Sequence, residues 1–436
     1  MNVKQAPIDR LLKPVHRFID LEYTGGLTLF SAVIVAIVWV NAGFADAYHH
    51  VWETPLSIGF GGKKLQLPLH HWINDGLMVI FFYVIGLELK REFMAGELSS
   101  PRKAILPLVA ALGGMLVPAG IYALVNRGGP GAPGWGIPMA TDIAFAIALI
   151  SLVGKSVPPA VKVFLSALAV ADDLGAVLVI ALFYSGNIQY TPLFIGLGLV
   201  AVLIIGNYMG IRHSAFYLLI GIGVWIGFLL SGVHATIAGV LVAFTIPART
   251  TIDEQAYSAR LKQLSDDFDT EVPERGSLTT LRQHQIIEEV KALSLAAQTP
   301  LQKIEHTLHP WVAYVIMPLF ALANAGITIG GDFIKGVSDP VSIGVILGLV
   351  IGKFTGVFSF TWVMIKSGLS AMPGDANWRH IAGVATLAGI GFTMSLFVSS
   401  LAFTDNANIE HAKYGILIAS VIAGSAGYFI LRKKPA

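Results

Sequence analysis

The sequence predicts an all-α polytopic membrane protein with twelve transmembrane helices, and three observations lead to this prediction. The 436-residue chain is 55% hydrophobic and only 13% charged, whereas soluble domains carry about 25% charged residues. The charged residues cluster between uncharged stretches about as long as the roughly 20 residues that a helix needs to cross a bilayer. Lys and Arg fall mainly in alternate loops, as in polytopic membrane proteins. The composition therefore argues against a water-soluble fold.

The predicted spans follow one another through short loops, with one long exception. The uncharged run 25–45 is too long for the apolar region of a signal peptide, so we expect it to remain as the first span. Hydropathy predicts spans at 25–42, 71–89, 104–125, 138–151, 160–184, 191–210, 214–231, 233–248, 310–329, 342–365, 380–403 and 412–431.

The basic residues predict that both termini are cytoplasmic. In that orientation, the outer loops hold only five of the 29 Lys and Arg residues, namely Lys63, Lys64, Arg127, Lys335 and Lys413. The chain then divides into a cytoplasmic N-terminal segment (1–24), spans one to eight (25–248), a cytoplasmic loop (249–309), spans nine to twelve (310–431) and a cytoplasmic tail (432–436). Within the loop, 281–295 has helical spacing, whereas 266–274 is expected to be irregular.

Spans four and eleven are expected to be interrupted. A Gly- and Pro-rich stretch precedes span four, which contains Pro138 and Thr141-Asp142, and span eleven contains Gly389-Ile390-Gly391. Each is the middle helix of a trio, so the two trios predict an inverted repeat with a substrate site near the bilayer midplane. The alternative is that these glycines only let neighbouring helices approach closely.

Ionisable residues inside the spans are the candidates for function. Each costs roughly 2.5–3.5 kcal/mol to insert, so each requires a reason. The spans contain Asp75, Glu88, Asp142, Asp172, Asp173 and Lys353. Glu88 lies near the cytoplasmic end of span two, and the other five lie deeper.

The adjacent pair Asp172 and Asp173 predicts an ion-binding site. Neighbouring helix residues point about 100° apart, so both carboxylates can reach one cavity without touching. Carboxylate oxygens suit a small hard cation such as Na+ or Li+, and burial and like charge both favour the protonated form. Protons and cations would then compete, which is the minimum mechanism of an antiporter and needs no cofactor. The alternative for either residue is a structural hydrogen-bond or salt-bridge role.

Asp142 and Lys353 are expected to support this site. Our hypothesis is that they offset the partial charges at the ends of the two broken helices. The alternative for Lys353 is to pair with Asp173 and itself release a proton. Asp75, near the outer end of span two, is predicted to have an entrance or structural role.

A second cluster, at the cytoplasmic side, suggests a pH response because its groups titrate near neutral pH. Its members are two short runs, Glu88, Arg91 and Glu92 on one helix face and Glu305, His306 and His309 before span nine. An ordinary solvated network would have the same spacing, and spacing alone favours that interpretation.

Other functional classes fit less well. The absence of cysteine excludes thiolate metal sites and thiol nucleophiles, and no basic block suggests a nucleic-acid partner. An intramembrane aspartyl protease needs carboxylates on different helices, whereas Asp172 and Asp173 are neighbours, so no enzyme is predicted. The remaining alternatives are a channel and a sodium- or proton-coupled symporter of a small solute, for which the deep charges offer little.

Motifs across nearly all spans resemble the NhaA family of bacterial sodium/proton antiporters. The matching stretches include Trp72-Ile73-Asn74-Asp75, Gly86-Leu87-Glu88, Ala140-Thr141-Asp142, Ala171-Asp172-Asp173, Gly232-Val233-His234, His309-Pro310-Trp311, Gly352-Lys353 and Gly389-Ile390-Gly391-Phe392-Thr393-Met394-Ser395.

The resemblance implies twelve helices, of which the fourth and eleventh are unwound and cross near the midplane. It assigns ion binding to Asp172 and Asp173, places Thr141, Asp142 and Lys353 around the crossing, and assigns a pH response to the cytoplasmic cluster. Electrogenic expulsion of Na+ or Li+ against incoming protons, in the bacterial inner membrane, would follow. The loop 249–309 is longer than is usual for the family. The oligomeric state stays open, with a homodimer among the alternatives.

Overall fold

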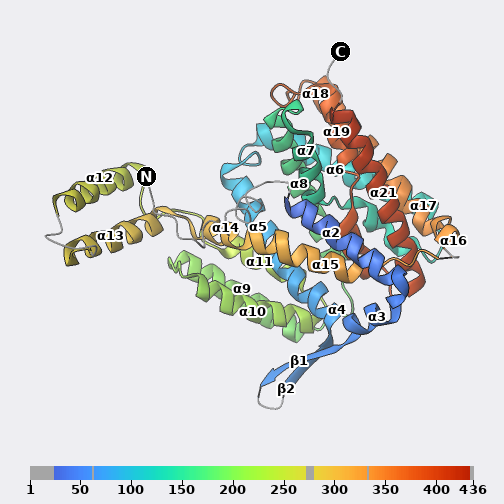
Figure 1. Cartoon of the computed structure of the whole chain (residues 1–436), viewed down its shortest axis with the longest axis horizontal. Helices are drawn as coiled ribbons and strands as arrows, with labels where there is room; N and C mark the ends of the chain where they lie inside the picture. Colours follow the sequence, from blue (N-terminus) through green and yellow to red (C-terminus); the bar gives the residue numbers. More distant parts are fainter. Residues whose placement is uncertain (1–23, 61–62, 272–278, 331–332, 433–436) are drawn as a thin grey trace.

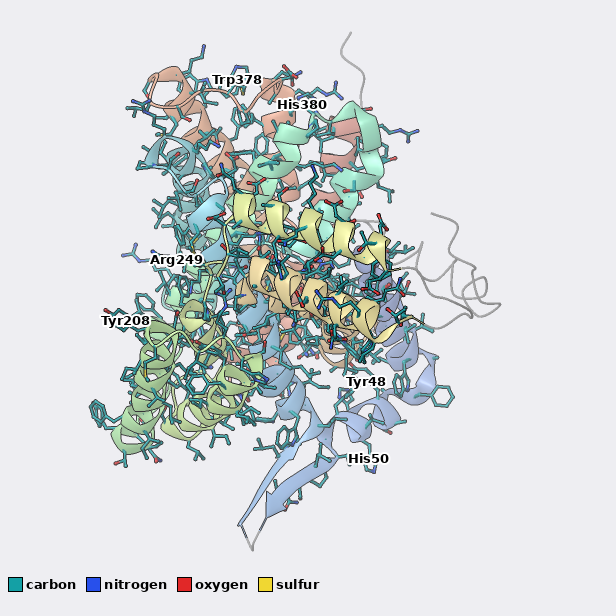
Figure 2. The ribbon with its side chains drawn as sticks, turned by 90° about the vertical axis from the view of Figure 1, so that its left-hand side faces the viewer. Tyr48, His50, Tyr208, Arg249, Trp378 and His380 are labelled. Atoms are coloured by element: carbon teal, nitrogen blue, oxygen red, sulfur yellow. The ribbon has the colours of Figure 1, made fainter. Side chains whose placement is uncertain are left out.

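The computed structural model describes residues 24–60, 63–271, 279–330 and 333–432, and the predicted N-terminal segment before residue 24 and the tail after residue 432 lie outside them. The described chain is a bundle of helices from which two hairpins project (Figure 1). Trp378 and His380 lie at one end of the molecule, and Tyr48 and His50 lie toward the opposite end (Figure 2).

The helices before the long loop are joined by short connections. They are α2 (Thr24–Trp39), α3 (Ala45–Glu53), α4 (Leu69–His71), α5 (Met78–Ala95), α6 (Pro101–Val125), a 3-10 segment (Ala132–Met139), α7 (Ile143–Val153), α8 (Pro159–Phe183), α9 (Tyr190–Tyr208), α10 (Ser214–Ser231) and α11 (Thr236–Thr245). Two π-helical turns, Val40–Phe44 and Trp72–Leu77, connect α2 to α3 and α4 to α5.

The long loop and the last spans contain the remaining helices. They are α12 (Glu254–Thr270), α13 (Leu281–Ala297), α14 (Pro300–Trp311), α15 (Met317–Asn324), α16 (Phe333–Val337), α17 (Pro340–Ile346), α18 (Lys353–Lys366), α19 (Trp378–Leu387), α20 (Phe392–Ala402) and α21 (Asn406–Arg432). The π-helical turns Val312–Ile316 and Leu347–Gly352 join α14 to α15 and α17 to α18.

Within the described residues, ten helices are long and apolar enough to cross a membrane, and the bent pair α19 and α20 raises the number to eleven. These eleven coincide with eleven of the predicted spans. The segment 233–248, predicted as the eighth span, contains only the short helix α11, which packs against α5. The chain is therefore a multi-pass membrane protein.

The fold is mostly helical, and the exception is the loop between the first two predicted spans. Strands β1 (Pro55–Phe60) and β2 (Lys63–Pro68) form an antiparallel hairpin whose register pairs Pro55 with Pro68, and this hairpin projects from the bundle (Figure 1). Each strand alternates apolar and polar residues, and Gly61-Gly62 separates them in the sequence. This is a hairpin signal, which a search for membrane helices overlooks because the segment is too polar to span.

The long loop is more helical than predicted. Helix α12 continues through 266–270, where irregular structure was expected, and Pro273 and Gly276 lie outside the described residues. Asp253 caps α12 by accepting a hydrogen bond from the Ala256 amide at 2.7 Å, a strong start signal that the sequence contained. Helices α12 and α13 form a hairpin that extends away from the membrane helices (Figure 1).

Backbone hydrogen bonds join the two ends of this helical hairpin and the segments that connect it to α11 and α14. The Thr251 amide donates to Ala296 O at 3.0 Å and the Leu301 amide donates to Pro247 O at 3.1 Å. Helix α14 begins at Pro300, ten residues before residue 310, where the predicted ninth span was placed. The charged residues of 300–309 hid this start because they lowered the local hydropathy.

Helices α6 and α18 cross at a point where only glycine fits. A Cβ atom on Gly113 would lie 2.5 Å from Gly356 O, and one on Gly356 would lie 2.6 Å from the carbonyl carbon of Gly113. Close approach of small residues is the main way in which helices pack in lipid, where no hydrophobic effect drives their association. This contact places Lys353, one turn before Gly356, against α6.

We predict that Gly356→Ala lowers the apparent melting temperature in detergent, because the added methyl group must displace the α6 backbone at a cost of about 1–3 kcal/mol. Gly120→Ala is the matched control on α6, since nothing lies within 4 Å of that site. It should be neutral or stabilising, because alanine favours helix over glycine by about 0.5–1 kcal/mol. Equal shifts in the two variants would contradict the close crossing.

Candidate functional site

Two breaks in the helices meet at Asp142. The chain is non-helical at 140–142, before α7, and at 390–391, before α20. The Asp142 carboxylate accepts hydrogen bonds from the Phe145 amide of α7 and the Thr393 amide of α20, each at 3.1 Å, and also from the Thr393 hydroxyl. One buried carboxylate therefore faces the amino ends of two helices, where a negative charge is favoured by the helix dipoles.

Further hydrogen bonds join the two breaks. The Asp142 amide donates to Ile390 O at 2.6 Å. The Thr141 hydroxyl donates to Ala388 O at 2.9 Å, and the Ser395 hydroxyl donates to Ile137 O at 2.8 Å. Breaking a helix leaves backbone groups without their usual partners, and inside a membrane these groups must be satisfied by protein. Here each break supplies partners for the other.

Asp172 and Lys353 form an ion pair in the interior. Both side chains are 0% exposed, and Lys353 Nζ lies 2.5 Å from Asp172 Oδ2. Asp172 comes from the middle of α8 and Lys353 from the start of α18. The structure thus pairs Lys353 with Asp172, whereas the pairing considered from the sequence was with Asp173.

Asp173 has an unusual environment for a buried carboxylate. It is fully buried, and in the described part of the chain neither of its oxygens has a hydrogen-bond partner. Asp172 Oδ1 likewise has none. Buried polar groups are almost always paired, and an unpaired buried carboxylate is especially costly. Three carboxylate oxygens on one helix are therefore available to a proton or a small cation.

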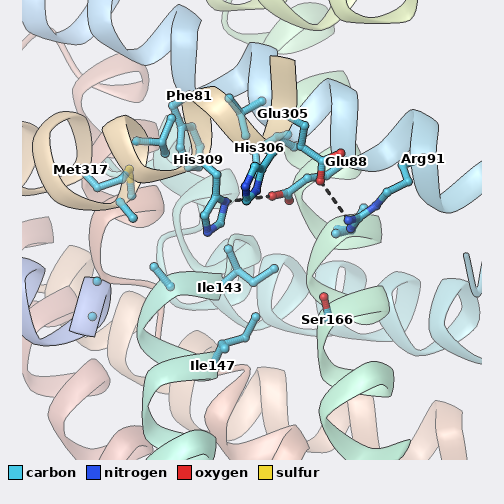
Figure 3. A pocket seen from close by; sticks show the side chains of 18 of the residues that line it. Phe81, Glu88, Arg91, Ile143, Ile147, Ser166, Glu305, His306, His309 and Met317 are labelled. Carbon is cyan, nitrogen blue, oxygen red and sulfur yellow. Dashed lines mark ion pairs between the residues drawn. The ribbon is translucent and has the colours of Figure 1, made fainter. Parts of the chain in front are cut away.

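Five of the six residues of the predicted cytoplasmic cluster, all except Glu92, line a cavity of about 550 Å³. Its ion pairs join α5 to α14: Arg91 Nη1 lies 3.0 Å from Glu305 Oε1, and His309 Nδ1 lies 3.6 Å from Glu88 Oε1. Figure 3 shows these side chains pointing toward one another. His306 also lines the cavity, and Arg91 Nη2 lies 3.3 Å from Glu92 Oε1.

Part of the lining of this cavity comes from α7, which Asp142 caps, and from α8, which carries Asp172 and Asp173. This part includes Ile143, the residue after Asp142, and Val170 on α8. Figure 3 shows Ile143 and Ile147 beyond the charged residues. The cavity therefore connects the charged mouth with the two helices that carry Asp142 and Asp173.

Asp75 lies elsewhere, in the π-helical turn before α5. Its backbone carbonyl accepts a hydrogen bond from Trp225 Nε1 at 3.0 Å. The neighbouring Asn74 accepts a hydrogen bond from Asn324 Nδ2 at 2.9 Å, and His70 Nε2 lies 3.1 Å from Asn324 Oδ1. Asp75 is thus next to a buried polar network that ties α4 and α5 to α15.

Two residues with evident roles were not selected from the sequence. Thr393 binds Asp142 through both its amide and its hydroxyl, and its position after the Gly389-Ile390-Gly391 break was the available signal. Lys90 donates to Phe244 O at 2.7 Å and to Ile246 O at 2.5 Å, at the end of α11. In the sequence, Lys90 served only as one of the basic loop residues that predict the orientation of the chain in the membrane.

No group of three or more His, Cys, Asp or Glu side chains that could hold a metal ion occurs in the described ranges.

Known proteins are similar to this chain over nearly its whole length. The family model described as Na+/H+ antiporter 1 matches residues 16–431. A relative from Oleidesulfovibrio alaskensis named Na(+)/H(+) antiporter NhaA is 48% identical over 427 residues, which are 98% of this chain and 95% of the relative. A protein of the same name from Acidithiobacillus ferrooxidans is 47% identical over 97% of this chain and 99% of its own length.

Among solved structures, the sodium proton antiporter MjNhaP1 from Methanocaldococcus jannaschii matches with a TM-score of 0.46 and 13% identity, covering 97% of this chain and 99% of that one. The match of the family model and the identity to full-length relatives establish the relationship. This chain belongs to the Na+/H+ antiporter 1 family.

Proposed function

We propose that this chain exchanges cytoplasmic Na+ or Li+ for external protons, with both ions competing for the carboxylates of Asp172 and Asp173. The observation that carries the proposal is Asp173, a fully buried carboxylate without a hydrogen-bond partner in the described chain. A proton or a cation neutralises this charge equally well, and the two exclude each other. The family membership supports the same exchange.

The ion pair and the crossing have supporting roles in this proposal. Lys353 pairs with Asp172, so it balances one of the two adjacent negative charges. Asp142 fixes the geometry of the crossing through α7 and α20, and Thr141 fixes it through Ala388. Exchange of more than one proton for each cation would make transport electrogenic, and Lys353 or Asp172 would carry the second proton.

The proposed topology is that of the sequence prediction. Twelve spans with both termini cytoplasmic place the mouth, formed by Glu88, Arg91, Glu305, His306 and His309, on the cytoplasmic side of a bacterial inner membrane. In this arrangement, α11 would be a short eighth span, and the segments broken at 140–142 and 390–391 would be equivalent members of an inverted repeat. Cytoplasmic cations would enter through the cavity of about 550 Å³.

The decisive assay uses the purified full chain in proteoliposomes, with a pH-sensitive dye reporting proton movement on addition of Na+ between roughly pH 6 and pH 9. We expect proton flux that requires Na+ or Li+ and no other solute. Absence of flux at every pH, in tight vesicles that contain folded protein, would reject antiport and favour the symporter.

We predict that Asp173→Asn abolishes exchange and leaves the apparent melting temperature unchanged or raises it. An amide cannot trade a proton for a cation, while the change removes a buried charge without a partner. Asp266→Asn, on the exposed surface of α12, is the matched control and should transport normally. Transport by Asp173→Asn at the wild-type rate would disprove the assignment, and a large loss of stability would indicate a structural carboxylate instead.

We predict that Lys353→Ala lowers stability by about 3–5 kcal/mol, because it leaves Asp172 buried and unpaired. The double variant Asp172→Asn/Lys353→Ala should recover much of this loss, since it removes both charges. Thermal unfolding of Asp172→Asn, Lys353→Ala and the double variant measures the coupling, and membrane-potential measurements on Lys353→Ala report whether the charge moved per cycle changes. Unchanged stability and unchanged charge movement would together contradict both roles given to Lys353.

A pH response is proposed for the mouth. Near pH 6 a histidine is largely protonated, and near pH 8.5 it is neutral. We therefore expect His309→Gln to remove a positive charge from the mouth only at low pH, and so to lower the apparent KM for Na+ at about pH 6 but not at about pH 8.5. His284→Gln, on exposed α13, should change neither value. Equal effects at both pH values would refute a titrating role for His309.

A further inference from the structure

A second cavity, of about 510 Å³, lies on the side of the bundle between α2, α7, α20 and α21. We call it the lateral groove. Its volume is within the roughly 300–1,000 Å³ of small-molecule sites. The side chains around it are almost all apolar, and the few polar ones are Ser420, Ser425 and Tyr428, all on α21.

The lateral groove opens on an apolar surface of the molecule. Large hydrophobic side chains at its edges are strongly exposed, with Phe30 at 48%, Leu152 at 56%, Val421 at 58% and Phe429 at 65%. These residues belong to helices that are long and apolar enough to cross the membrane. A groove among such residues faces the hydrocarbon layer, so the molecules available to fill it are lipid acyl chains.

Apolar shape alone does not hold a lipid in place, because an acyl chain in the groove leaves an equally apolar environment in the bilayer. Selective occupancy needs a headgroup contact. The carboxyl end of α21 provides one: the exposed Arg432 side chain lies over the Tyr428 ring at 5.7 Å, and Tyr428 lines the groove. Arg379 lies at the same end, where it donates to Ile430 O at 2.6 Å and to Leu431 O at 3.0 Å.

The inner wall of the groove is formed by residues next to the two helix breaks at 140–142 and 390–391, whose junction we call the helix crossing. Phe145, Ile390 and Phe392 line the groove. The Phe145 amide donates to the Asp142 carboxylate, Ile390 O accepts from the Asp142 amide, and the Phe392 amide donates to Ser420 Oγ at 3.3 Å. The rings of Phe145 and Phe392 pack edge to face, with their centroids 5.4 Å apart. A chain in the groove would therefore contact the residues that hold Asp142.

We propose that the lateral groove binds the acyl chain of an anionic phospholipid, whose phosphate lies beside Arg432, and that this lipid stabilises the helix crossing from the membrane side. The lining of the groove shares only Gly26 with that of the cytoplasmic cavity and contains none of the buried carboxylates. Its occupant is a lipid because the groove is apolar, opens sideways and ends at a cationic residue.

The test uses the purified full chain in detergent, titrated with dioleoyl phosphatidylglycerol or with dioleoyl phosphatidylcholine, and reads the apparent melting temperature from tryptophan fluorescence. For the unmodified chain we expect a saturable rise with phosphatidylglycerol at lower concentrations than with phosphatidylcholine. Val421→Trp fills the groove and should abolish the saturable rise. Ile422→Trp is the matched control, because Ile422 is also exposed but lies outside the groove.

The headgroup contact is tested separately. Arg432→Gln should weaken the apparent affinity for phosphatidylglycerol by about fivefold, as expected for one basic residue at a membrane surface, and should leave the phosphatidylcholine response unchanged. Lys366→Gln is the control, since Lys366 is an exposed basic residue at the end of a different helix, α18.

Two outcomes would overturn the proposal: a normal phosphatidylglycerol response in Val421→Trp, or an equal loss in Val421→Trp and Ile422→Trp. If Val421→Trp does not fold, Ser425→Trp fills the groove one turn later on the same exposed face of α21. Native mass spectrometry should then find less phosphatidylglycerol retained by Ser425→Trp than by Ile422→Trp. Equal retention would disprove the site.

Discussion

The rest of the structure depends on one constraint, which is that charged side chains buried away from water must be compensated by a partner. Lys353 and Asp172 are both fully buried and pair at 2.5 Å, an arrangement that persists only because each compensates the other. The α6–α18 crossing at Gly113 and Gly356 brings the lysine into the interior, and α8 presents the aspartate to it. Among the described residues no basic side chain forms an ion pair with Asp173, and the exchange that we propose uses this imbalance.

The same constraint acts on the backbone. A helix broken inside a membrane exposes amide and carbonyl groups that lipid cannot satisfy. The breaks at 140–142 and 390–391 satisfy each other, with Asp142 accepting amides from both α7 and α20. The two breaks therefore form a single hydrogen-bonded unit, although they lie about 250 residues apart in the sequence. Side chains with hydroxyl groups, Thr141, Thr393 and Ser395, supply its remaining bonds.

Much of this arrangement could be predicted because membrane spans are governed by local composition. Hydropathy located eleven helices or bent helix pairs, and the cost of burying charge selected Asp142, Asp172, Asp173 and Lys353. The residues alone did not determine which atoms of distant segments meet, and a meeting of the fourth and eleventh spans was expected only from the family resemblance. No pattern near Lys353 indicates whether it meets Asp172 or Asp173, because both are on α8 and the choice depends on how α18 packs.

The remaining differences between the predicted and the observed structure all lie in polar segments. The β1–β2 hairpin, helix α12 and the early start of α14 all lie in stretches where hydropathy carries no information. Local signals were present there: alternation on either side of Gly61-Gly62, the cap residue Asp253 and the Thr299-Pro300 start of α14. These signals act at short range and are independent of the membrane.

The buried Asp173 carboxylate, whose oxygens have no hydrogen-bond partner among the described residues, has a consequence for the leakage of ions. In an exchanger built on this carboxylate, the empty site would carry an uncompensated charge, and moving that charge through hydrocarbon to face the other side would be costly. A site loaded with either ion has lost that charge and can change its access freely. The buried charge of the empty site would thus suppress slippage. The site could reorient only with a proton or a cation bound, so the movement of one ion would be coupled to the movement of the other.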